Sequence, residues 1–113
     1  MGVMATVLFV VLGLGSASTD PNRAPDPNRA NEAFESGNRY LQSGYPDNAL
    51  LEFNRGLAIV PDSIPGLLGR AATYQALGDV ERAIADYTAV LEIDPNNADA
   101  LRELSLARGS SGQ

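Results

Sequence analysis

The sequence contains no histidine, cysteine, tryptophan or lysine, and each absence removes a class of function. Without cysteine and histidine there is no disulfide, no thiolate nucleophile, no imidazole base and no common zinc ligand. The basic residues are all arginine, and 8 of them against 14 acidic residues give a net charge of 8 − 14 = −6. An acidic chain of this kind lacks the positive surface that binds nucleic acid. We therefore expect no enzyme activity, no cofactor, no metal and no nucleic acid partner.

The length of 113 residues allows one small domain. A hydrophobic content of 44% with 19% charged residues is typical of a globular protein. These numbers exclude a collagen, a long coiled coil and a wholly disordered chain.

An uncharged, apolar segment opens the chain. Residues 3–14 are almost all apolar, and as a helix they would reach only about 18 Å, against roughly 30 Å for a bilayer core. Small residues follow, so we predict a signal peptide over residues 1–18, cleaved after Ala17 or Ser18. An uncleaved membrane anchor at residues 3–14 and a buried helix are the alternatives. A signal peptide predicts an exported protein, periplasmic or secreted. A membrane anchor predicts a protein held at the cell envelope.

Residues 19–30 contain the pentapeptide DPNRA twice, with three prolines in all. Proline lacks the backbone N–H that helices and sheets need and fixes an extended φ. We therefore expect an extended, proline-rich linker over residues 19–30.

The rest of the chain repeats with a period of 34 residues. Sliding the sequence by 34 positions aligns eight pairs, of which six are identical. A fixed period of this length indicates stacked structural units. The pairs are Gly37/Ala71, Tyr40/Tyr74, Gly44/Gly78, Ala49/Ala83, Phe53/Tyr87, Leu57/Leu91, Ile59/Ile93 and Pro61/Pro95.

Each unit is predicted to begin with a helix that ends at a glycine. The small residue and the tyrosine of each unit share one helical face, so we expect the tyrosines to point inward in equivalent surroundings. Gly44 and Gly78 stand where a left-handed residue ends the helix with least strain. The second helices then start near Pro46 and Val80, and proline suits a first helical turn.

The second helix of each unit carries an apolar stripe. Ala49, Phe53 and Leu57 recur every four residues, and the second unit repeats this spacing. A proline ends each of these helices. Ser63 and Asn97 then stand in the position of an N-cap for the next helix.

These residues resemble the tetratricopeptide repeat. The resemblance implies an all-α fold, an α-α superhelix of antiparallel hairpins with about five helices. It places repeat 1 at residues 31–63, repeat 2 at residues 64–97, a capping helix at residues 98–108 and a disordered tail at residues 109–113. The signature residues are Gly37, Tyr40, Gly44, Ala49, Phe53 and Pro61 in repeat 1, and Ala71, Tyr74, Gly78, Ala83, Tyr87 and Pro95 in repeat 2.

The sequence departs from the family pattern at several positions. Ser36 and Arg70 replace a leucine, and Gly56 replaces a helix-forming alanine at a cost of about 1 kcal/mol. In the capping helix, Leu104 and Ser105 together with Leu101 are expected to face inward. Two repeats and a cap are fewer than the three that usually stabilise such a stack.

The resemblance also implies a function, because ligands of this family lie along the concave face formed by the first helices. We expect a protein–protein interaction module, an adaptor that binds a peptide or protein segment there. Repeats that bind acidic chaperone C-termini use lysine, asparagine and arginine; only Asn38 matches, whereas Asp99 and Glu103 have the opposite sign. The expected contact residues are Asn31, Phe34, Asn38, Leu41, Leu68, Ala72, Gln75 and Arg102.

Other functions remain open at this point. One is a self-assembling structural unit of the same fold, a homo-oligomer. Another is a calcium-binding or enzymatic envelope protein, since Asp94, Asn96 and Asp99 supply alternating oxygen atoms. These residues lack the glycine and distant glutamate of an EF-hand loop, and an ordinary turn with an N-cap explains them better.

Overall fold

The computed structural model describes residues 26–111, which form five α-helices and no strand. The helices are α2 (Pro27–Gln42), α3 (Pro46–Ile59), α4 (Ile64–Ala76), α5 (Val80–Ile93) and α6 (Ala98–Ser111). The predicted all-α fold of about five helices is therefore confirmed. Within residues 26–111, no helix is both long enough and apolar enough to cross a membrane.

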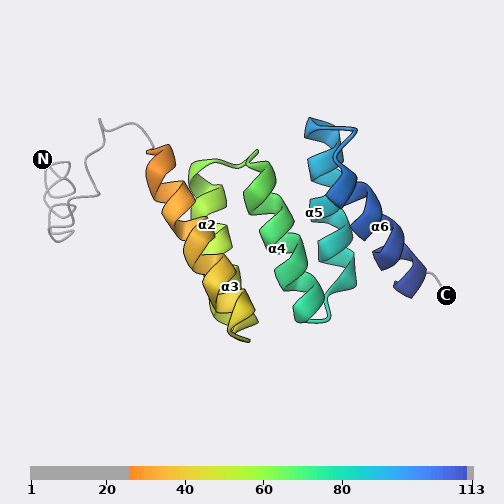
Figure 1. Ribbon diagram of the computed structural model, residues 1–113, viewed down its shortest axis with the longest axis horizontal. Coiled ribbons are helices and arrows are strands. Elements are labelled where there is room, and N and C mark those ends of the chain that lie inside the picture. Colours follow the sequence, from red (N-terminus) through yellow and green to blue (C-terminus); the bar gives the residue numbers. More distant parts are fainter. Residues whose placement is uncertain (1–25, 112–113) are drawn as a thin grey trace, which may run out of the picture.

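The helices follow one another in a row, with α2 and α6 at opposite ends (Figure 1). Each helix packs against the next one in the chain, and α2 also contacts α4. Because short turns join the helices, α2 with α3 and α4 with α5 form two hairpins, and α6 closes the row. This is the stacked arrangement that the 34-residue period predicts.

Glycine and N-cap residues set the ends of the helices. Gly44 and Gly78 have φ values of 87° and 82°, the left-handed conformation predicted for them. The Ser63 hydroxyl accepts a hydrogen bond from the Gly66 backbone N–H at 3.1 Å, so this predicted N-cap is confirmed. The Asn97 side chain likewise accepts one from the N–H of Ala100, at 2.9 Å.

Two stacked phenylalanine rings form the centre of the first repeat. The Phe34 and Phe53 ring centroids are 6.4 Å apart, and both side chains are buried. The Phe34 ring lies so close to Gly56 that a Cβ there would stand 2.3 Å from its Cε1 atom. A Cβ at Gly69 of α4 would likewise lie 2.3 Å from Cε1 of Phe53. Glycine thus supplies space for each ring where the helices approach closely.

The predicted linker is too long at its C-terminal end. Helix α2 begins at Pro27, and the Asp26 carboxylate accepts a hydrogen bond from the Asn28 N–H at 3.0 Å. Proline is tolerated at the first helical position, where its missing N–H would have no partner, so Pro27 starts the helix instead of preventing it. Ala30, predicted to lie in the linker, is fully buried. Residues 1–25, with the predicted signal peptide and the first DPNRA, lie outside the described residues.

The capping helix is longer than predicted, and a different set of its residues faces the core. Helix α6 continues through Ser111, so the prediction of disorder is wrong for residues 109–111; residues 112–113 lie outside the described part. Leu104 is buried as expected, but its buried companions are Ala100 and Ala107. Leu101 is 50% exposed and Ser105 is exposed, because the described chain has no second helix to cover that face of α6.

Candidate functional site

A shallow hollow of about 320 Å³ lies where side chains of α4, α5 and α6 meet. We call it the α4–α6 groove. It brings together four of the predicted contact residues with three others. The lining residues are Leu68, Ala72, Gln75, Tyr87, Asp99, Arg102 and Glu103.

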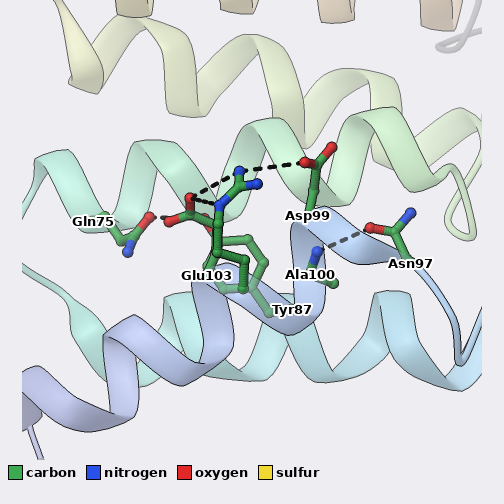
Figure 2. Close-up of polar contacts among 7 residues, drawn as sticks. Gln75, Tyr87, Asn97, Asp99, Ala100 and Glu103 are labelled. Carbon is green, nitrogen blue, oxygen red and sulfur yellow. Dashed lines mark hydrogen bonds and ion pairs between the residues drawn. The ribbon is translucent and has the colours of Figure 1, made fainter.

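The floor of the groove is apolar, with one polar point. Leu68 and Ala72 of α4 are partly buried, and the Tyr87 side chain from α5 is only 2% exposed. The Tyr87 hydroxyl donates a hydrogen bond to Oε1 of Gln75 at 2.7 Å, which ties α5 to α4 (Figure 2). Burial, together with the negative charge of Glu103, raises the pKa of Tyr87 to about 12. The phenol is therefore neutral at physiological pH and serves as a fixed hydrogen-bond donor.

Three charged side chains of α6 form the rim. Nη2 of Arg102 lies 3.3 Å from Oδ1 of Asp99 and 3.3 Å from Oε2 of Glu103. The rim therefore holds two carboxylates and one guanidinium. Side chains of Asp99 and Arg102 are 63% and 60% exposed, and that of Glu103 is 29% exposed.

The predicted contact residues of the first repeat do not line this groove. Phe34 is only 5% exposed, so its predicted role as a partner contact is wrong. The glycines opposite its ring let Phe34 enter the core instead of facing outward. Asn31 and Asn38 are exposed and Leu41 packs against the core, and none of the three lines the hollow.

Tyr87 is the contact that sequence reasoning missed. The sequence predicts Tyr87 only as a repeat-signature residue, equivalent to the fully buried Phe53. The signal that could have revealed it is the hydroxyl group, since a buried tyrosine needs a hydrogen-bond partner for its polar end. From the sequence, Asp99 is a candidate calcium ligand and a charge of the wrong sign for an acidic peptide, and Glu103 is only the latter; neither is predicted as a partner contact.

The two signature tyrosines have different surroundings. Tyr74 is partly buried, packs against the core, and has the Arg70 guanidinium 5.8 Å from its ring centroid. Tyr40 is 38% exposed and lines a separate hollow with polar neighbours near the end of α2. The expected equivalence is therefore only partial. The reason is that Ser36 stands in repeat 1 where Arg70 stands in repeat 2, and the small serine covers less of the ring.

A second charged cluster has a structural role. Nε and Nη2 of Arg70 each lie 2.8 Å from an oxygen of Asp86, and Nη1 donates to Oδ1 of Asn54 at 2.9 Å. These side chains come from α4, α5 and α3, so one guanidinium links three helices. The hydrogen bonds with Asp86 raise the pKa of Arg70. This cluster explains why arginine replaces the leucine expected at this position.

The oxygen-rich turn before α6 is engaged in local hydrogen bonds. Oδ1 of Asp94 accepts a hydrogen bond from the Asn96 N–H at 3.2 Å, and the Asp99 carboxylate pairs with Arg102. Within residues 26–111, no three acidic, histidine or cysteine side chains come close enough together to hold a metal ion. The geometry is that of an inter-repeat turn followed by an N-cap.

Comparison with known proteins agrees with this geometry. The family model described as "Tetratricopeptide repeat" matches residues 64–97. Residues 64–97 are therefore similar to a tetratricopeptide repeat. The matched segment covers α4, α5 and the turn that leads to α6, with the bounds predicted for repeat 2.

Solved tetratricopeptide domains share the whole arrangement. The Sgt2 TPR domain from Aspergillus fumigatus superposes with a TM-score of 0.72 and 29% identity, covering 79% of this chain and 58% of that one. The second TPR of Spaghetti (RPAP3), solved bound to the HSP90 peptide SRMEEVD, also has a TM-score of 0.72. It is 23% identical, and the match covers 76% of this chain and 80% of that one. The fold is therefore that of a short tetratricopeptide array.

Curated relatives are similar over a short part of their own length. The mitochondrial import receptor subunit TOM34 of Rattus norvegicus is 39% identical over 66 residues, which is 58% of this chain and 21% of that protein. The bacteriophage adsorption protein A of Escherichia coli (strain K12) is 35% identical over 74 residues, 66% of this chain and 7% of that protein. The chain thus spans about a fifth or less of the length of these relatives.

Proposed function

We propose that this protein is a non-enzymatic interaction module that binds a peptide segment of a partner protein in the α4–α6 groove. The observation that carries the proposal is the convergence of Leu68, Ala72, Gln75 and Arg102, all predicted contacts, on one hollow of a tetratricopeptide fold. Its apolar floor and polar rim are the features that peptide recognition uses. Support also comes from RPAP3, whose similarly folded second repeat domain is bound to a peptide.

The test is to select binding peptides from a displayed random library and to map where they bind. We expect NMR chemical-shift changes in the isotope-labelled protein to concentrate on Leu68, Gln75, Tyr87 and Arg102. Shift changes that concentrate on the exposed face of α3 would contradict the proposal.

A pair of leucine variants provides the control. Leu68→Ala removes part of the groove floor and should weaken binding of a selected peptide about tenfold. Leu51, on α3, is 68% exposed and lies outside the groove, so Leu51→Ala should leave the affinity unchanged. Equal affinities for the two variants would place the binding site elsewhere.

A second candidate function is self-assembly through the free face of α6. Leu101 is 50% exposed there, whereas Leu67, the residue 34 positions before it, is only 5% exposed. A second copy could cover this face by helix packing. Analytical ultracentrifugation over a hundredfold concentration range should then show a dimer that Leu101→Gln abolishes; a monomer throughout would exclude this candidate.

Export is a separate proposal, and it rests on residues 3–14 and the small residues after them. We propose that the chain enters the secretory route and is cleaved after Ala17 or Ser18. N-terminal sequencing of the protein recovered from fractionated source cells should find Ser18 or Thr19 first. An intact Met1 in the soluble intracellular fraction would contradict export.

A further inference from the structure

The charges around the α4–α6 groove do not balance. Its single cation, Arg102, lies between the carboxylates of Asp99 and Glu103, so the rim carries one positive and two negative charges. The whole chain has the same sign, with a net charge of −6. The groove itself therefore has a net charge of −1, because Arg102 neutralises only one of the two carboxylates.

Arg102 uses only part of the hydrogen-bonding capacity of the Asp99 and Glu103 carboxylates. It contacts one oxygen of each, Oδ1 of Asp99 and Oε2 of Glu103, at 3.3 Å or more. Short charge-assisted hydrogen bonds measure about 2.7–2.9 Å, so these are loose contacts between exposed groups. A carboxylate accepts through both oxygens, and a bound cation can therefore join Arg102 without displacing it.

The apolar floor lies beside this acidic rim. Leu68 and Ala72 of α4 line the same hollow as Asp99 and Glu103 of α6. The Tyr87 hydroxyl donates its hydrogen to Gln75, and none of the four floor residues carries a positive charge. Burial is the main cause of the raised pKa of Tyr87; the charges of Glu103 and Asp99 raise it further, and that of Arg102 lowers it.

We propose that the α4–α6 groove selects peptide segments in which a basic side chain stands next to a branched apolar one. The guanidinium or ammonium group pairs with Asp99 and Glu103, and the apolar side chain packs on Leu68 and Ala72. This inference rests on the proposed function and adds the chemical class of the ligand. A peptide with acidic side chains would meet two carboxylates of like charge, which opposes its binding.

Three matched peptides test the selection: GLRALRG, its neutral form GLQALQG and its acidic form GLEALEG, each capped at both ends. Affinities are measured with the full chain by fluorescence anisotropy. We expect GLRALRG to bind about tenfold tighter than GLQALQG, and GLEALEG to bind more weakly than either. The advantage of GLRALRG should shrink as salt is raised, because charge pairs at an exposed rim are screened.

Charge-neutralising variants locate the effect. Glu103→Gln and Asp99→Asn should each weaken GLRALRG about three- to tenfold and weaken GLQALQG less, so that the ratio of the two affinities falls. Glu35→Gln is the matched control, since it removes one negative charge from the exposed surface of α2, away from the groove. Far-ultraviolet circular dichroism confirms that each variant has folded.

The outcomes separate this inference from the function on which it rests. If GLRALRG binds no tighter than GLQALQG, or if Glu35→Gln weakens it as much as Glu103→Gln does, selection by the rim is overturned while peptide binding stands. If library selection yields peptides that bind this groove but are acidic, the inference again fails alone. If neither these peptides nor any selected peptide binds the groove, both proposals fail.

Discussion

Gly56 shows how a single residue is set by its neighbour in space. Helix propensity alone predicts that Gly56→Ala stabilises α3 by about 1 kcal/mol. In the structure a Cβ at this position would lie 2.3 Å from Cε1 of Phe34, with two more ring atoms within 2.9 Å. The buried ring must then move, and overpacking of this kind costs about 1–3 kcal/mol. We expect Gly56→Ala to lower the free energy of unfolding, measured by urea denaturation followed by circular dichroism.

Gly109 provides the comparison for this prediction. It is also helical, in α6, but a Cβ built there would meet no atom within 4 Å apart from its chain neighbours and the backbone of its own helix. Gly109→Ala should therefore be neutral or stabilising by up to about 1 kcal/mol. If Gly56→Ala is as stabilising as Gly109→Ala, the close contact with Phe34 does not govern this position.

Tyr87 makes stability depend on pH in the alkaline range. Its pKa rises from 10.0 to about 12 in the folded protein, so the folded state keeps a proton that the unfolded chain releases. The contribution of the protonated Tyr87 to the free energy of unfolding is present in full below pH 10, and it is lost as the pH rises toward about 12. Urea denaturation at pH 9, 10 and 11 should show a falling free energy of unfolding. Tyr87→Phe should show a weaker fall, and an equal fall would contradict the assignment to Tyr87.

At the scale of helices, Arg70 joins α3, α4 and α5. Asp86 is buried, with its side chain 8% exposed, and Arg70 is its only cationic partner among residues 26–111. Arg70→Ala leaves this carboxylate without its partner, and we expect a loss of about 2–4 kcal/mol in the free energy of unfolding. Arg55→Ala removes an exposed guanidinium, 68% accessible, and should change it by less than about 0.5 kcal/mol. Similar losses for both variants would show that burial of the Arg70–Asp86 pair does not determine its effect on stability.

The sequence predicts the helices well because the repeat supplies several independent signals for each. Gly44 and Gly78 end the first helices, Ser63 and Asn97 cap later ones, and the family match has the predicted bounds of repeat 2. The start of α2 is not predicted by the sequence pattern, because three prolines within twelve residues favour an extended linker. Pro27 instead takes the one helical position that suits it.

The contact residues were harder to predict because side-chain direction depends on more than one helix. Phe34 holds the repeat position that Leu68 holds in the groove, yet Phe34 is buried against glycines of α3 and α4. Leu101 holds the position of the buried Leu67 and is exposed, because within residues 26–111 no helix follows α6. A local pattern gives the periodicity of a helix, but the neighbours that cover each face are a tertiary property.

At the scale of the whole molecule, α6 closes the row and also supplies the acidic rim. Ala100 and Leu104 belong to the same hydrophobic cluster as Tyr87 and Val90 of α5. In a stacked array each unit contacts mainly its neighbours, so a defect in α6 acts on the remainder through α5. A short array is expected to unfold as one cooperative unit, because no single hairpin buries enough apolar surface to persist alone.

Leu104→Ala tests this coupling. Leu104 is 7% exposed, and truncating a buried leucine costs about 2–5 kcal/mol, so the unfolding midpoint of the whole protein should fall. Leu106, two positions further on, is 58% exposed, and Leu106→Ala should change the free energy of unfolding by less than about 0.5 kcal/mol. Hydrogen exchange by NMR gives the decisive measurement. If the array is cooperative, Leu104→Ala lowers the protection of amides in α2 as well as in α5. If protection falls in α5 and α6 alone, the two hairpins unfold separately, and a ligand in the α4–α6 groove would stabilise only the second of them.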